Sequence, residues 1–545
     1  MQFTKLFSCI KFVPKEFNSV RVVSRSYCAG TPQESTCSVE ESNQANNLDG
    51  SKKGLVVGVY ESGKKFELTP TAEEINQKTN GKLCKYLNEL SSQLKLGKAF
   101  TVTDLLPEYS AVAITCFGPK DPGYNKLEEL DETKENVRWG VGAGVRELQA
   151  RGVGHIDVEP AASCRAAAEA AELAAWRFQE FSSCKEPKSR VSLYTGEDSR
   201  DESLTSEWNE GAEFGRAQNW ARFLSDMPAN KMTPVDLAQA ALDTLCPLGV
   251  RVEVREGAWV EAAGLRALQA AARGGGGGAL LLECSLARAA TAAPPVLLAA
   301  TGVTFDSGGL CLRRGRDLAA GHAAMAGAAA TLAAMRTIAK LKVPLNVVAV
   351  IPLCENMISG QCMKVGDVVQ ALNGIYMQIE DTDNEGHLML ADALVYGQAV
   401  HKPSLVIDVA TLTKGVMVAT GGGAYGCFSS CERAWRTLQH AGAITGDRPW
   451  RLPLWEYYHR QLTDDPSVDL RNKGSGKATS CLGAAFLRRF VCCDWLHLDT
   501  RGVERGGPPY LRGRRMSGRP ARPLALALQL IAQESSATPP AAAAT

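Results

Sequence analysis

The stretch VLLAATGVTFDSGG, residues 296–309, joins a short apolar run to a segment that carries one acid and three glycines. A run of five apolar residues bounded by turn-forming residues is typical of a strand that is buried on both faces of a sheet. In an open α/β sheet, ligands bind beyond the carboxyl ends of the strands, so we expect Asp306 at a functional edge. The stretch therefore indicates both a fold class and a place for chemistry.

Similar apolar runs recur on both sides of this stretch. Downstream, residues 345–351 and 405–409 are strand-like, and residues 323–341 have a helical pattern. Upstream, strand-like runs at 54–60 and 111–116 precede a helical segment at 161–181. Such alternation favours α/β domains with largely parallel sheets. We expect two α/β domains, residues 54–205 and 206–534, the larger C-terminal one with a mixed central sheet flanked by helices.

The first thirty residues differ in composition from the rest. They carry five Lys or Arg residues against one acid, Glu16, and apolar residues recur at helical spacing. This pattern predicts a mitochondrial transit peptide and a matrix location, with a basic disordered terminus and a cytoplasmic protein as the alternatives. A secretory signal is disfavoured because Lys11 and Lys15 interrupt the apolar run. The polar residues 31–53 are expected to form a disordered linker, and residues 535–545 a low-complexity tail.

The overall composition excludes several classes of partner. Sixty Lys and Arg residues face fifty-nine Asp and Glu, a net charge of +1, so we expect no nucleic-acid surface. No apolar run reaches the roughly twenty residues that a membrane span requires. The seventeen cysteines are scattered and odd in number, which indicates reduced thiols in an intracellular compartment.

Two further segments are expected to lie near Asp306. The first is DTDNEGHL, residues 381–388, and the second is ATLT, residues 410–413, which follows the strand expected at 405–409. Asp383 and Glu385 are two residues apart in a turn, so both can reach one ion. Carboxylate oxygens are hard ligands that suit Mg, Mn or Zn.

Together with these segments, five other motifs occur in a specific order: WAR at 220–222, DMPANKMTP at 226–234, PLCEN at 352–356, GDVV at 366–369 and TGDR at 445–448. In this combination the chain resembles the leucyl (cytosol) aminopeptidase family over nearly all of the second block and, more loosely, the first. The resemblance implies a homohexamer in which two divalent metals activate a water that attacks the peptide bond beside a free amino terminus.

Three of the seven site groups that the resemblance implies are present: Asp306, Asp383 and Glu385, at the positions of metal-binding carboxylates. The other four positions depart from the family pattern: Thr301 for a ligating lysine, Ala324 for a ligating aspartate, Arg313 for the lysine that polarises the substrate, and His387 for an arginine that holds bicarbonate. Three carboxylates and Arg313 sum to a charge of −2, which one divalent ion neutralises. We therefore expect at most one ion of Mn or Zn per subunit, or none.

Three histidines could also contribute to the site or to the fold. His322 and His387 lie near the predicted site and are candidates for substitute metal ligands, but a solvent-facing or hydrogen-bonded histidine is the more common case. His497 lies in a strand-like segment, and we interpret it as structural.

These observations lead to three functional hypotheses. Losing one preorganised electrostatic group costs on the order of a hundredfold to a thousandfold in turnover, so four changes predict a catalytically impaired or inactive protein, a pseudoenzyme. Such a protein would act through assembly in mitochondria, as in the sperm-abundant insect branch of the family that this chain resembles. The alternatives are a working aminopeptidase that releases amino-terminal residues, and a peptide-binding module without turnover.

Overall fold

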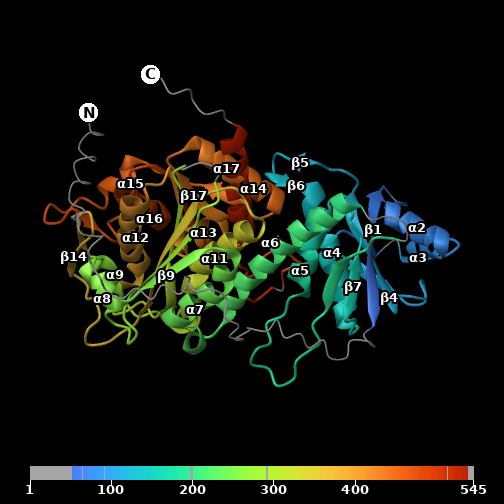
Figure 1. Ribbon diagram of the computed structural model, residues 1–545, viewed down its shortest axis with the longest axis horizontal. Coiled ribbons are helices and arrows are strands. Elements are labelled where there is room, and N and C mark those ends of the chain that lie inside the picture. The colour runs from blue at the N-terminus through green and yellow to red at the C-terminus, as the bar shows by residue number, and fades with distance from the viewer. Residues whose placement is uncertain are drawn as a thin grey trace.

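The protein is described by a computed structural model that covers residues 52–537 except 64, 91–92, 197–200, 290–292 and 512. The expected transit peptide, almost all of the expected linker and residues 538–545 of the tail lie outside this range. Two α/β blocks lie beside each other, the N-terminal block in blue and teal at the right and the larger C-terminal block at the left (Figure 1). The predicted fold class is confirmed.

The N-terminal block is built on a sheet with the strand order β3-β4-β1-β7-β8, to which β2 adds beside β1. Its strands are β1 (Lys53–Ser62), β2 (Lys65–Leu68), β3 (Ala99–Val102), β4 (Ala111–Pro119), β7 (His155–Val158) and β8 (Arg190–Leu193). Helices α2 (Pro70–Lys78) and α3 (Lys82–Leu90) pack on one face, and α4 (Glu132–Ala150) and α5 (Cys164–Ala175) on the other. A small hairpin pairs β5 (Tyr124–Asn125) with β6 (Leu130–Asp131).

The C-terminal block is built on a larger sheet with the order β18-β17-β20-β16-β11-β13-β10-β9, and β12 pairs with the end of β13. Its strands are β9 (Arg251–Arg255), β10 (Leu280–Leu286), β11 (Val296–Ala300), β12 (Gly302–Asp306), β13 (Val347–Asn356), β16 (Leu405–Ala410), β17 (Tyr425–Ser429), β18 (Pro449–Arg451) and β20 (Asp494–Asp499). The sheet is mixed, because β11 runs parallel to β13 and β16 while β10 runs antiparallel to β13. All of β11 is buried, as its continuous apolar sequence predicts.

Helices cover both faces of this sheet. One face packs against α7 (Pro234–Leu245), α11 (Ala326–Lys340), α14 (Glu432–Thr445) and α17 (Ala521–Ala537), and the other against α9 (Arg266–Ala272), α12 (Glu385–His401) and α16 (Thr479–Leu487). The alanine-rich α11 lies very close to the sheet. A Cβ atom on Gly327 would lie 2.5 Å from the carbonyl oxygen of Val409, so only glycine fits there.

Shorter elements lie around this core. The helices are α8 (Gly257–Ala262), α10 (Gly315–Ala319), α13 (Lys414–Thr420) and α15 (Glu456–Arg460), and a small sheet joins β14 (Val368–Gln370), β15 (Tyr376–Gln378) and β19 (Leu470–Arg471). The glycine run at 274–278 is a loop between α9 and β10, as expected. Within the described ranges, no helix combines the length and the hydropathy that a membrane span needs.

Helix α6 (Glu202–Asp226) belongs to both blocks. Its first half contributes Trp208 and Ala212 to the core of the N-terminal block, and its second half contributes Phe214 and Leu224 to the core of the C-terminal block. The domain boundary expected at residue 205 therefore lies inside a continuous helix.

A buried ion-pair network also joins the blocks. Glu169 on α5 accepts hydrogen bonds from Arg138 on α4 at 2.9 Å and from Arg522 on α17 at 2.6 Å. Each of these three side chains is about 1% exposed. Burial raises the pKa of the Glu169 carboxyl, but the two guanidinium groups outweigh that effect and lower it to about 2. Glu169 is therefore charged in the folded protein.

Candidate functional site: a carboxylate cluster closed by an arginine

The three predicted carboxylates come together at the carboxyl edge of the large sheet. Asp306 ends β12, Asp383 lies in a short 3-10 turn, and Glu385 begins α12. Their oxygen atoms can all lie within 4.8 Å of one another, close enough to share a metal ion. Asp306 is fully buried and Glu385 is 5% exposed. Burial, followed by the charge of Asp306, raises the pKa of Glu385 well above its usual value.

Arg313 inserts its guanidinium group into this cluster. Its Nη2 atom forms an ion pair with Asp306, and its Nε donates a hydrogen bond to Asp383. The side chain is only 10% exposed. Burial opposes its charge, but the surrounding carboxylates overcome that effect and raise the pKa of Arg313 above its usual value. The cluster therefore already contains one permanent cation, drawn from the chain itself.

Sequence reasoning gave no role to Asn356 or Thr382, which hold the cluster in place. The Asn356 amide, at the end of β13, donates to Asp306 at 2.9 Å and to the carbonyl oxygen of Thr382 at 3.0 Å. The Thr382 hydroxyl donates to the carbonyl of Gly308 at 2.6 Å. In the sequence, the one feature that pointed to Asn356 was its position as the last residue of the PLCEN motif. It acts as a neutral donor, so it orients the acids without adding charge.

The positions that the resemblance assigned to two further ligands supply no anionic group. Thr301 and Ala324 are 3% and 6% exposed, and the Thr301 hydroxyl has no hydrogen-bond partner among the residues that the structure describes. Both residues line an inner cavity of about 10 Å³ together with Glu385 and His387. A space of this size holds about one water molecule. Beside the three acids, the described lining of this cavity thus offers no lysine or aspartate at these two positions.

His387 is a buried, neutral imidazole. It is 3% exposed and lies edge-on to Phe486 with the ring centroids 5.5 Å apart. Burial, reinforced by His497, lowers its pKa to about 3. Because the ring is uncharged at neutral pH, it cannot replace an arginine that holds an anion.

The other two histidines lie outside the carboxylate cluster. Nε2 of His322 accepts a hydrogen bond from Arg505 at 3.0 Å, so the lone pair that would bind a metal is engaged. His497, on β20, donates to Asp408 on β16 at 2.5 Å and stacks on Phe428. The fully buried His497 thus links neighbouring strands inside the sheet.

A second pocket of about 240 Å³ lies outside the inner cavity. Its rim carries Lys414, Lys473 and Arg501, and its floor includes Arg313 and His387. Beneath it, Asp499 at the end of β20 accepts hydrogen bonds from the backbone nitrogens of Leu412 and Thr413, which fixes the loop after β16. The predicted ATLT segment therefore lines the pocket, as its place after a strand suggested.

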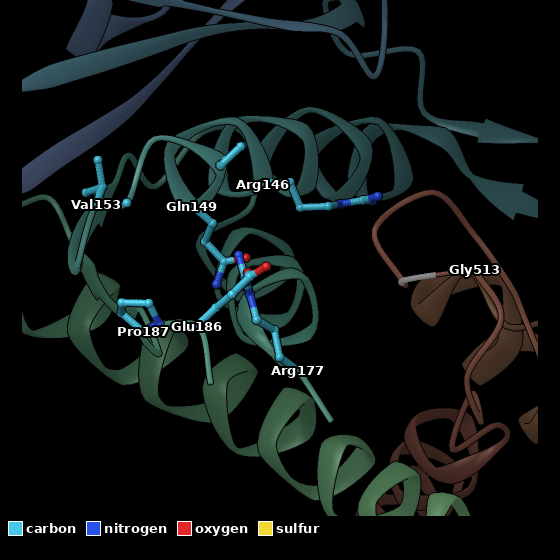
Figure 2. Close-up of a pocket in the computed structure, with 9 residues that line it drawn as sticks. Arg146, Gln149, Val153, Arg177, Glu186, Pro187 and Gly513 are labelled. Carbon is cyan, nitrogen blue, oxygen red and sulfur yellow. The ribbon is translucent and has the colours of Figure 1, made fainter. Parts of the chain in front are cut away.

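A wider cavity of about 740 Å³ lies elsewhere, where α4 of the N-terminal block faces the loop containing Gly513 (Figure 2). Arg146 and Gln149 of α4 point into it, and Arg177 forms an ion pair with Glu186 at its side. None of its lining residues belongs to the predicted site. Volume alone therefore does not locate the chemistry in this molecule.

Two family models match the chain and account for most of it. The catalytic domain of the cytosol aminopeptidase family matches residues 219–525, and the N-terminal domain of the same family matches residues 56–185. The chain belongs to the cytosol aminopeptidase family. The resemblance inferred from the sequence motifs is thereby confirmed, together with the α/β fold of both blocks.

Individual relatives support this assignment. Cytosol aminopeptidase of Xenopus tropicalis is 37% identical over 489 residues, which is 88% of this chain and 92% of the relative. The solved structure of the bottromycin maturation enzyme BotP in complex with Mn has a TM-score of 0.74 and 27% identity, over 88% of this chain and 99% of that one. A tomato leucine aminopeptidase mutant has a TM-score of 0.73 at 23% identity, over 88% and 94% of the two chains, and shows the shared fold.

Proposed function

We propose that this member of the cytosol aminopeptidase family does not hydrolyse peptides at a useful rate and acts through its folded assembly. The observation that carries the proposal is the composition of the site. Asp306, Asp383 and Glu385 converge, but Thr301 and Ala324 place no anionic ligand beside them. A two-metal centre clamps both the attacking and the leaving group, and this site has ligands for one ion at most.

The same residues limit which metal chemistry remains. A divalent ion, Mn or Zn, would be held by Asp306, Asp383 and Glu385 and would supply an activated water. Beside this ion, the imidazole of His387 is neutral and provides no positive charge that could bind an anion such as bicarbonate. Arg313 presents a planar guanidinium that is committed to two carboxylates, so it is not free to polarise a substrate carbonyl as a compact ammonium would.

The competing function is a metal-dependent aminopeptidase that releases amino-terminal residues, which agrees with the names of the relatives. The deciding assay is hydrolysis of a leucyl amide by the protein lacking residues 1–30, with excess Mn or Zn and bicarbonate. A parallel variant carries Thr301→Lys, Arg313→Lys, Ala324→Asp and His387→Arg. We expect activity only in the restored variant. Metal-dependent turnover by the natural protein would favour the competing function.

A third function, peptide binding without turnover, is compatible with the 240 Å³ pocket beside the carboxylate cluster. Binding of a leucyl peptide without turnover, measured by calorimetry on the natural protein, would support a binding module over a purely structural role.

The proposed assembly is a homohexamer in mitochondria, with the sperm-abundant insect branch of the family as an analogy for its role. Support for the location comes from the basic residues 1–30, whereas the relatives named cytosol aminopeptidase favour the cytoplasm. Sedimentation of the purified protein tests the assembly, and a stable monomer under dilute conditions would contradict it. Fractionation of cells that express the full chain tests the location.

A further inference from the structure

We propose that Arg313 is the resident cation of this site, taking the place of a divalent metal ion, so that the protein folds without metal. The inference goes beyond the proposed loss of hydrolysis, because a protein can be inactive and still bind an ion. It rests on where the guanidinium lies rather than on which ligands are missing.

The first argument is the geometry of the contacts. A guanidinium presents five N–H donors in a rigid plane and bonds two carboxylates with one charge. Here Nη2 is paired with Asp306 and Nε with Asp383, the two acids that come from different segments of the chain. Arg313 therefore cross-links β12 to the 3-10 turn before α12, which is what an ion shared by these acids would do.

The second argument is how firmly Arg313 is held. Its backbone nitrogen donates to the carbonyl of Ser307 at 2.8 Å, which closes the short loop that follows Asp306. Within that loop, the backbone nitrogen of Cys311 donates to the Thr382 hydroxyl at 2.8 Å, and this hydroxyl donates to Gly308. The loop is thus fastened to the turn that carries Asp383. These hydrogen bonds hold the backbone of Arg313 beside the cluster. Little backbone conformational entropy is therefore lost when its side chain pairs with the carboxylates.

The third argument is the cost of displacement. Buried carboxylates that lie this close together repel one another and are stabilised by a nearby cation. An ion that enters the cluster must first break both contacts of Arg313, whose side chain is 10% exposed, and leave that charge without its partners. Removing one partner of a buried ion pair is strongly destabilising.

The test uses the full-length natural protein, the variant Arg313→Met, and the matched control Arg314→Met, which makes the same change at an exposed neighbour. Each protein is incubated with Mn²⁺ or Zn²⁺, desalted and analysed for metal content, and its melting temperature is measured with EDTA and with added ion. For the natural protein and the control we expect no stoichiometric metal and no shift of the melting temperature in either condition.

For Arg313→Met we expect a lower melting temperature in EDTA. Mn²⁺ at about one hundred times its dissociation constant should raise it again by roughly 2–3 °C, because an ion then occupies the vacated cluster. If that variant does not fold, Arg313→Lys takes its place, since lysine keeps one charge but cannot span both carboxylates. About one ion per natural chain, or a natural protein destabilised by EDTA, would overturn the inference.

These results remain separate from those of the hydrolysis assay. A natural protein that binds a stoichiometric ion but does not hydrolyse leucyl amide contradicts the inference and leaves the proposed function standing. A natural protein that hydrolyses the amide while free of metal contradicts the proposed function and leaves the role of Arg313 standing.

Discussion

Replacing Glu169 with glutamine tests how strongly the buried ion network holds the two blocks together. The substitution keeps the shape of the side chain and removes the charge that Arg138 and Arg522 share. The pKa of Glu169 falls from 4.5 to about 2 in the folded protein. A fall of about 2.5 units corresponds to ~3 kcal/mol in favour of the charged form. The mutational cost of breaking a buried pair, about 3–5 kcal/mol, agrees with this figure.

The assay is guanidinium chloride unfolding at pH 7 and fixed protein concentration, followed by both tryptophan fluorescence and circular dichroism. We expect Glu169→Gln to lower the free energy of unfolding by ~3 kcal/mol. The control is Glu210→Gln, which removes a partly exposed partner of Arg165 and should cost less than about 1 kcal/mol. Equal effects of the two variants would refute the reasoning.

The same carboxylate predicts an acid dependence whose sign can be checked. Because the folded pKa of Glu169 lies below the unfolded value, its contribution to stability is complete above pH 4.5 and is lost as the pH falls towards about 2. The glutamine variant should lack this part of the acid-induced loss. A natural protein and a variant with parallel pH profiles in this range would contradict the assignment.

Three further predictions concern other parts of the molecule. Burial raises the pKa of Glu159 to about 8, so its contribution to stability is present below pH 4.5 and is lost as the pH rises through about 8. Urea titrations at pH 5 and pH 8 should therefore show a smaller decline for Glu159→Gln than for the natural protein. Asn356→Leu leaves Asp306 and the Thr382 carbonyl without their shared donor and should lower the free energy of unfolding by about 1–3 kcal/mol in denaturant melts. Gly327→Ala should cost about 1–3 kcal/mol through its clash with Val409, whereas Gly276→Ala, with open space around it, should melt like the natural protein.

Strand positions were predictable from the sequence because they depend on local composition. The run at 296–300 is β11 over the same residues, and the run at 405–409 is β16 with one residue more. The helix expected over 161–181 ends earlier, at Ala175, because Trp176 takes up an extended backbone. Its ring lies 4.0 Å from the Arg222 guanidinium on α6, a contact between distant segments that a local pattern does not contain.

The site was predictable to the same extent. Asp306 was expected beyond the end of a strand, and Asp383 and Glu385 were expected to reach one ion from a single turn; the structure brings the three together. The pairing of Arg313 with two of them was not expected, since it depends on a loop folded by backbone hydrogen bonds. The charge state of His387 was not accessible either, because it is set by the packing of α16 around the ring.

Because helix α6 belongs to both blocks, it determines what happens when the two blocks are expressed as separate fragments. Because Trp208 and Phe214 lie on one continuous helix but belong to different cores, a cut at residue 205 leaves only the first few residues of α6 on the N-terminal piece and assigns the rest to the C-terminal piece. That piece would then carry the apolar side chains of Trp208 and Ala212 into water, and the N-terminal piece would lose part of its own interior. Because α6 contributes to both cores, we expect the two blocks to unfold together.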